Sequence, residues 1–156
     1  GETPMFITTL LIIHGVIAVF LLGAITHQTL GVFWPRQPGQ TDFVAQARTL
    51  RPQIYVQVII LLYVIEFALG ALIYPAYRVV SRPPLEDLRI LYVIGVFEAK
   101  ENFAAIVLAM LPAYWYFWSK QPEYRKVRAA MTAILFVTVW YNFVAGHIVN
   151  NARGLL

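Results

Sequence analysis

Four polar side chains interrupt long apolar stretches of this 156-residue sequence: His14, Glu66, Glu98 and Asn142. Counted from the nearer end of each stretch at a helical rise of about 1.5 Å per residue, all four lie roughly 12 to 15 Å deep. A charge at that depth in a bilayer costs about 2.5–3.5 kcal/mol even on the most lenient scale, so it faces protein, water or a cofactor. We therefore expect these residues to meet in one polar layer.

Carboxylate and imidazole side chains in that layer have the chemistry to hold a metal ion. Glu98 and Glu101 are one helical turn apart. Helical bundles bind metals with such residues, although the sequence has no paired Glu-x-x-His motif of the di-iron type. An intramembrane metal-dependent enzyme is therefore one hypothesis, and its predicted ligands are His14, Glu66, Glu98 and Glu101.

The histidines also allow a haem b, for which His14 and His147 are the candidate ligands. A quinone is an alternative, because the last apolar stretch carries an aromatic and hydrogen-bonding strip near its end. The predicted cofactor-binding residues of this strip are Trp140, His147, Asn150, Asn151 and Arg153. A simpler interpretation is that the last three only end the helix at the water interface. Without cysteine, the chain itself cannot hold an Fe–S cluster or a c-type haem.

Lys100 lies in the middle of the third apolar stretch and points away from its acidic neighbours. At about 100° per residue, Glu98 and Asn102 share a helix face, whereas Lys100 lies about 200° from Glu98. One helix thus presents charge on two sides, which favours a partner subunit or a water-filled cleft, with Asn102 and Asn142 as further polar contacts. The alternative is a local ion pair in which Lys100 reaches Glu66.

The composition places these residues in a membrane protein. The chain is 60% hydrophobic and 13% charged, and its mean hydropathy is +0.65. Such a chain is typical of bilayer-embedded proteins, and its longest polar stretch is too short for a separate soluble domain. We expect a single transmembrane domain over residues 1–156. The net charge of +4 comes from residues between the apolar stretches, which argues against nucleic-acid binding.

The spacing of charges and prolines predicts an all-α bundle of four transmembrane helices. Pro35 ends the first, Pro52 opens the second, and Pro112 is expected to kink the third. The predicted spans are about 5–34, 52–75, 88–118 and 129–151. Apolar residues at helical spacing also predict a short amphipathic helix over 41–50 on the inner surface, with an ordered loop as the alternative.

Basic residues near the helix ends set the expected orientation. Seven lie in the first and third connections and four on the opposite side, which predicts that both termini are outside. Trp34, Trp115 and Trp118 then lie at the inner interface, where tryptophan is enriched. The expected location is a bacterial inner membrane.

A short multi-helix anchor with a few intramembrane histidines and acidic residues resembles the small membrane subunits of respiratory complexes. The resemblance is one of architecture, and no family's functional residues are carried over from it. It implies a non-catalytic or electron-transfer subunit of a larger redox complex, whose polar layer serves a haem b, a quinol or a subunit contact. The expected partners are lipid and other membrane subunits or further copies of the chain. An accessory or scaffold subunit is the remaining alternative.

Overall fold

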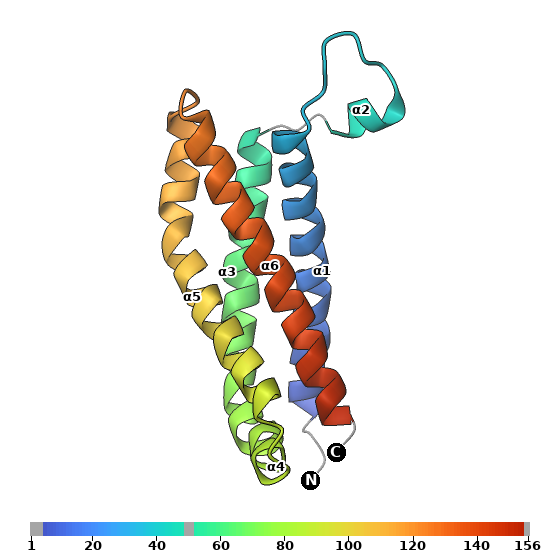
Figure 1. Ribbon diagram of the computed structural model, residues 1–156, viewed down its shortest axis with the longest axis vertical. Helices are drawn as coiled ribbons and strands as arrows, with labels where there is room; N and C mark the ends of the chain where they lie inside the picture. Colours follow the sequence, from blue (N-terminus) through green and yellow to red (C-terminus); the bar gives the residue numbers. More distant parts are fainter. Residues whose placement is uncertain (1–4, 49–51, 155–156) are drawn as a thin grey trace.

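The computed structural model describes residues 5–48 and 52–154, and this part of the chain is helical with no β-strand. Four long helices run along the molecule (Figure 1). Their bounds are α1 Met5–Phe33, α3 Pro52–Ala76, α5 Leu91–Lys120 and α6 Arg125–Gly154. Shorter elements join them, namely α2 Phe43–Ala47, the π-helical turn η1 Tyr77–Ser81 and α4 Arg82–Asp87. The predicted all-α fold is confirmed.

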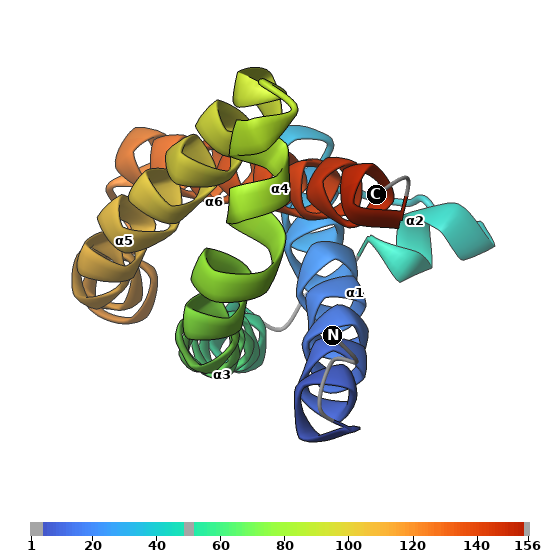
Figure 2. The ribbon, with the colours of Figure 1, turned by 90° about the horizontal axis from the view of Figure 1, so that it is seen from below.

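The four long helices pack in a ring. α1 packs against α3 and α6, and α5 packs against the same two helices. α1 begins and α6 ends at the end of the bundle that carries α4, whereas α2 and the α5–α6 turn lie at the opposite end (Figure 1). Seen from the α4 end, α6 crosses over the others instead of running parallel to them (Figure 2).

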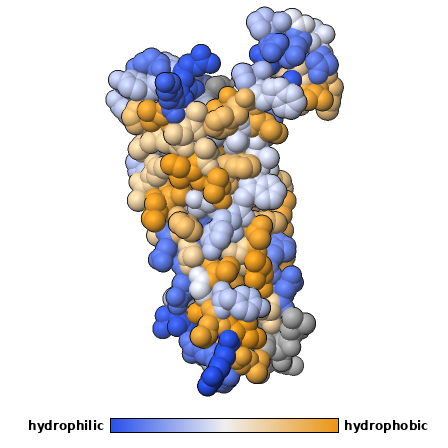
Figure 3. Space-filling model, in the orientation of Figure 1, coloured by the Kyte–Doolittle hydropathy of each residue, from blue (hydrophilic) through white to orange (hydrophobic). Residues whose placement is uncertain are grey.

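Within the described residues, three stretches are long and apolar enough to cross a membrane: Met5–Phe33, Gln53–Asp87 and Arg125–Ala152. Large apolar side chains are exposed along them, and apolar residues cover much of the middle of the molecule between more polar ends (Figure 3). A water-soluble protein would not expose such a belt. The chain is therefore an integral membrane protein in contact with lipid. α5 is as long as its neighbours but carries charged residues near its middle.

The best-packed part of the bundle lies toward the α2 end. Ile25, Ile59 and Leu135 are fully buried there, together with the ring of Tyr114. The Tyr114 hydroxyl donates a 2.6 Å hydrogen bond to the Oε1 atom of Gln28, which is also fully buried. A buried amide normally has such a partner, because an unmade hydrogen bond in an apolar core is costly.

The helical structure continues beyond Pro75, where the sequence predicted an end. Pro75 lies inside α3, and the chain continues through η1 and α4 as far as Asp87. Proline removes one main-chain hydrogen bond, and a wider π turn two residues later lets the helical path continue. The third long helix consequently begins at Leu91, not at residue 88, and it extends to Lys120.

The other boundaries differ from prediction by smaller amounts. α1 ends one residue earlier than predicted, and α6 extends beyond both predicted ends, over Arg125–Gly154. The amphipathic helix predicted over 41–50 is observed as the shorter α2, and residues 49 and 50 lie outside the described residues. α2 begins where the Asp42 carboxylate accepts a 3.1 Å hydrogen bond from the Ala45 amide, as a helix N-cap does.

The turn between α4 and α5 holds Arg89 in a left-handed conformation, with φ of 54°. The Ile90 amide donates to the Leu85 carbonyl and the Arg89 amide to that of Glu86, which together form a Schellman motif. This motif favours glycine, since a side chain in the left-handed region is strained.

We expect Arg89→Gly to stabilise the protein by about 0.5–1 kcal/mol, because glycine adopts this conformation without strain. Thermal unfolding in detergent would measure the change. Arg89→Ala is the matched control, since it removes the charge but keeps a Cβ and the strain. An equal shift in both variants would show that charge, and not backbone conformation, is responsible.

Candidate functional site

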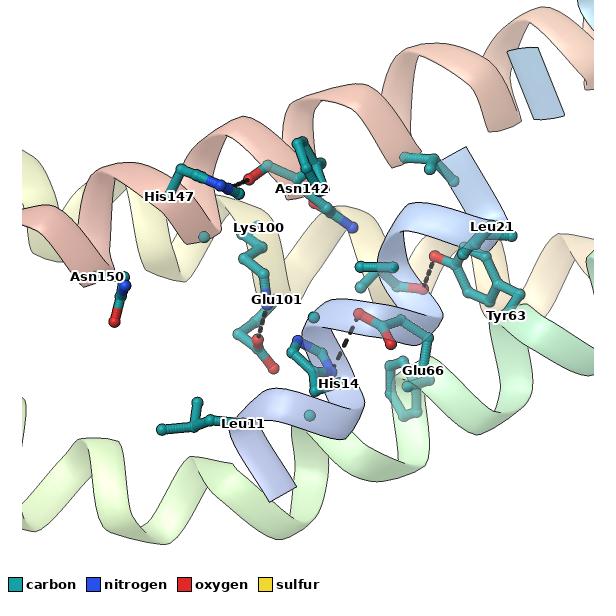
Figure 4. A pocket seen from close by; sticks show the side chains of 18 of the residues that line it. Leu11, His14, Leu21, Tyr63, Glu66, Lys100, Glu101, Asn142, His147 and Asn150 are labelled. Carbon is teal, nitrogen blue, oxygen red and sulfur yellow. Dashed lines mark hydrogen bonds and ion pairs between the residues drawn. The ribbon is translucent and has the colours of Figure 1, made fainter. Parts of the chain in front are cut away.

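A cavity of about 390 Å³ lies among the four long helices. It is lined by residues 8–21 of α1 and 139–150 of α6, which places it in the half of the bundle where α1 begins and α6 ends. α3 and α5 complete the wall with Tyr63, Glu66, Lys100 and Glu101. The four helices thus place polar groups around one internal space (Figure 4).

His14 and Glu66 form the first polar pair of the cavity. His14 Nδ1 lies 3.0 Å from Glu66 Oε1, and the two side chains are only 22% and 17% exposed. Nδ1 makes no hydrogen bond of good geometry within the described residues, so the contact is a close approach of two polar groups. Gly70 lies beside this pair, and a Cβ there would be 3.7 Å from His14 Cε1. The imidazole therefore sits directly against the α3 backbone.

Lys100 and Glu101 form the second pair, and both line the cavity from α5. Lys100 Nζ donates a 3.2 Å hydrogen bond to Glu101 Oε1, and the lysine side chain is 14% exposed. Both pairs point into the same space (Figure 4). Lys100 thus neutralises part of the negative charge that Glu66 and Glu101 bring into the bundle. Lys100 forms a local ion pair, although its partner is Glu101 and not the predicted Glu66, and it also lines the cavity.

The α6 wall combines an aromatic ring with hydrogen-bonding groups. The His147 ring lies 4.6 Å from that of Phe143, and its Nδ1 donates a 3.2 Å hydrogen bond to the Phe143 carbonyl. A carbonyl can only accept, so Nδ1 carries the proton and Nε2 is free to accept. Asn142 and Asn150 lie on the same wall.

Small residues give the cavity its width. A Cβ added at Gly15 of α1 or at Gly146 of α6 would meet no atom within 4 Å. Ala18 and Ala104 line it as well. Larger side chains at these positions would fill the space, since helices otherwise pack with few voids.

Two buried oxygen atoms of the lining have no hydrogen-bond donor within the described residues. They are Glu66 Oε2 and Asn142 Oδ1. The Tyr63 hydroxyl, which also lines the cavity, donates instead to the Ala104 carbonyl at 2.9 Å. Buried polar atoms are satisfied in most proteins, so unpaired acceptors beside a cavity point to a bound group that donates to them.

The cavity opens between α1 and α6. The exposed residues of its lining all belong to these two helices. They are Thr8, Ile12, Gly15, His147 and Asn150. Ile12 is 64% exposed. In a membrane-embedded bundle, such an opening between two apolar helices faces lipid.

A second cavity of about 140 Å³ continues from the first toward the α4 end. The two share His14, Gly70, Lys100 and Glu101. The second reaches the π turn η1, where Tyr77 and Ser81 line it. π turns are frequent at functional sites, and this one forms part of the wall of the smaller cavity.

Glu98 does not join the other predicted metal ligands. Its carboxylate lies 3.3 Å from an Arg82 nitrogen, its side chain is 56% exposed, and it does not line the cavity. Arg82 also pairs with Glu86 at 2.6 Å. The predicted set of His14, Glu66, Glu98 and Glu101 is thus divided, because Glu98 faces α4 whereas Glu101 faces α1 and α6. No group of three metal-ligating side chains occurs within 5–48 and 52–154.

Several other predicted residues lie outside the cavity. Asn102 is exposed on the outer face of α5. The Trp140 indole donates a 3.0 Å hydrogen bond to Thr26 Oγ1 on α1. Asn151 is exposed at the end of α6, and the Arg153 side chain lies outside the described part of the molecule. Of the predicted strip, His147 and Asn150 therefore line the cavity.

Two features escaped the sequence analysis. Tyr63 lines the cavity one turn before Glu66, and this spacing of three residues was the available signal. At the α2 end, His27 Nδ1 lies 2.5 Å from the Tyr55 hydroxyl, and its Nε2 contacts the Ala47 carbonyl. His27 therefore connects α1 to α2 and α3 by polar contacts. These contacts lie away from the cavity, at the α2 end of the bundle.

Comparison of the chain with protein-family models, with curated proteins and with solved structures finds no match.

Proposed function

We propose that this chain is a quinone- or quinol-binding membrane subunit of a larger redox assembly. The observation that carries the proposal is the cavity itself, which combines apolar walls, a few convergent polar groups and an opening between α1 and α6. Its volume lies in the range of about 300–1,000 Å³ that is common for small-molecule sites. A ligand that enters between two lipid-facing helices must itself dissolve in the bilayer, as a quinone does.

In this proposal all four long helices cross the membrane, and both termini face the outer side of a bacterial inner membrane. α5 is as long as the other three and packs between α3 and α6, so it shares their depth. Most basic residues of the described chain lie near the α2 end, as expected for the cytoplasmic side. The polar cavity then lies in the outer half of the bilayer.

The polar lining suits the two oxygen atoms of a quinone ring. His14 is held by Glu66 at Nδ1, which leaves Nε2 to exchange a proton with one ring oxygen. Across the cavity, His147 and Asn150 can meet the other oxygen, while Phe67 and Phe143 supply apolar surface. The His14 imidazole is a group of this lining that can take up a proton released by a quinol.

The electrons of such a reaction need an acceptor, and this chain has no cysteine for an Fe–S cluster. A one-electron carrier on a partner subunit would supply it. Asn102 on the outer face of α5 is a candidate contact for that subunit, because an amide facing lipid lacks hydrogen-bond partners.

Haem b is the second candidate, and one observation favours it. Nδ1 of His14 faces a carboxylate and Nδ1 of His147 a main-chain carbonyl, which is how metal-bound histidines are usually oriented. The Nε2 atoms would then be the iron ligands. A visible spectrum of the purified protein decides this point, because a haem gives a Soret band that His14→Ala or His147→Ala would remove.

We expect Gly146→Leu to weaken binding of a short-chain benzoquinone by at least about ten-fold, because the new side chain fills the cavity. Isothermal titration calorimetry on protein in lipid nanodiscs would measure the dissociation constant. Leucine also favours helix over glycine, so the fold should persist. Gly23→Leu is the matched control, since Gly23 also lies in open space but does not line the cavity. Equal binding by both variants would contradict the proposal.

A further inference from the structure

We infer that the site distinguishes the two redox states of its ligand and binds the dihydroxy form, the quinol, more tightly than the quinone. The inference rests on the proposed function, because it concerns the same cavity and the same class of ring. It is carried by two buried acceptor oxygen atoms beside the cavity, one of them a carboxylate oxygen, that receive no hydrogen bond within the described residues.

Two of the unpaired polar atoms beside the cavity are acceptor oxygen atoms. Glu66 Oε2 and Asn142 Oδ1 are buried and receive no hydrogen bond from the described residues. His14 Nε2 adds a third acceptor, since the carboxylate beside Nδ1 favours a proton on that nitrogen. These groups come from α1, α3 and α6, so they surround the space instead of lining one side of it.

Three donors of the lining are engaged within the protein. The Tyr63 hydroxyl donates to the Ala104 carbonyl, Lys100 donates to Glu101, and His147 Nδ1 donates to the Phe143 carbonyl. A ligand that needs one of these three donors would have to compete with its bond. A ligand that brings its own donors would satisfy the unpaired oxygen atoms without breaking any bond.

Quinols and quinones differ in this respect. A quinol carries two hydroxyl groups, each of which donates a hydrogen bond, whereas the two carbonyl groups of a quinone can only accept. A hydroxyl on Glu66 makes a charge-assisted hydrogen bond, which is roughly twice as strong as a neutral one. A carbonyl in the same place faces the carboxylate with its lone pairs, and the carboxylate stays unpaired. The preference arises from binding alone and requires no electron transfer.

The test compares two ligands that differ only in redox state. Wild-type protein in lipid nanodiscs is titrated under anaerobic conditions with tetramethyl-1,4-benzoquinol and with tetramethyl-1,4-benzoquinone, and heat release gives both dissociation constants. We expect the quinol to bind at least about ten-fold more tightly. Glu66→Gln should remove most of this ratio, since its amide can donate to the quinone. Glu98→Gln should leave the ratio unchanged, because Glu98 lies outside the cavity.

The outcomes separate the inference from the proposed function. If neither ring binds to wild type, both fail. If both bind with equal constants, or the quinone binds more tightly, the inference fails and the proposed function stands. If Glu66→Gln does not fold, the ratio of the quinol and quinone dissociation constants of wild type still tests the inference. In that event Asn142→Leu, which removes another acceptor, is expected to reduce the ratio, and an unchanged ratio would overturn the role given to the acceptors.

Discussion

Lys100→Met is expected to destabilise the bundle by about 3 kcal/mol, the lower end of the range for breaking a buried ion pair. Lys100 is the cation paired with Glu101 in the cavity, and Glu66 is a second carboxylate of the same lining. Without the ammonium group, two carboxylates share a poorly hydrated space. Glu101 is 33% exposed, so water relieves part of the cost. Denaturation in mixed micelles would measure the loss of free energy of unfolding.

The charge explanation is tested by a second change in the same pair. Lys100→Met combined with Glu101→Gln removes both charges and should recover most of the lost stability. Lys120→Met is the matched control, because Lys120 is exposed at the end of α5 and should change stability by less than about 0.5 kcal/mol. Should the double variant be no more stable than Lys100→Met, packing of the lysine stem would be the cause.

Tyr114→Phe is expected to destabilise the bundle by about 1–3 kcal/mol, although it removes a single oxygen atom. The Tyr114 hydroxyl is the donor to Gln28 Oε1, and both residues are fully buried. Its loss leaves an amide oxygen in an apolar core without a partner, and the full desolvation cost of that oxygen appears in the folded state. The free energy of unfolding in mixed micelles is again the measurement.

A double-mutant cycle isolates this hydrogen bond. Gln28→Leu together with Tyr114→Phe should be more stable than Tyr114→Phe alone, because no polar atom is then left unpaired. Tyr116→Phe is the control, since the Tyr116 hydroxyl contacts Gln121 at an exposed site. If both Tyr→Phe variants cost the same, the buried bond contributes nothing specific.

The sequence predicts the fold and part of the candidate site because depth in a membrane can be counted. His14 and Glu66 each lie a definite number of residues from a helix end, and the cost of a charge in lipid requires a partner at the same level. The structure places them 3.0 Å apart. The all-helical, membrane-embedded fold follows from length and apolarity, which are also readable from the sequence.

Glu98 was wrongly grouped with Glu66 because its partner depends on tertiary structure. Counting places Glu98 at a suitable depth, but its direction on α5 points it toward α4. There Arg82 is available only because the chain remains helical beyond Pro75, through a π turn. No local pattern predicts that continuation, since proline usually ends or kinks a helix.

Pairs between distant helices were missed for a related reason. The Gln28–Tyr114 hydrogen bond joins α1 to α5, and the Tyr63 hydroxyl reaches from α3 to the α5 backbone at Ala104. Which helices are neighbours, and which faces they turn to each other, follows from packing of the whole ring. Periodicity within one helix contains no such information.

The charged middle of α5 also bears on how the protein is made. If α5 left the translocon by itself, Glu98, Lys100 and Glu101 would each add about 2.5–3.5 kcal/mol to the free energy of transferring this helix into lipid. The next helix, α6, follows after only a short turn and packs along α5. Both helices should therefore leave the translocon together as a hairpin, so a nascent chain that stops before residue 125 would hold α5 at the channel.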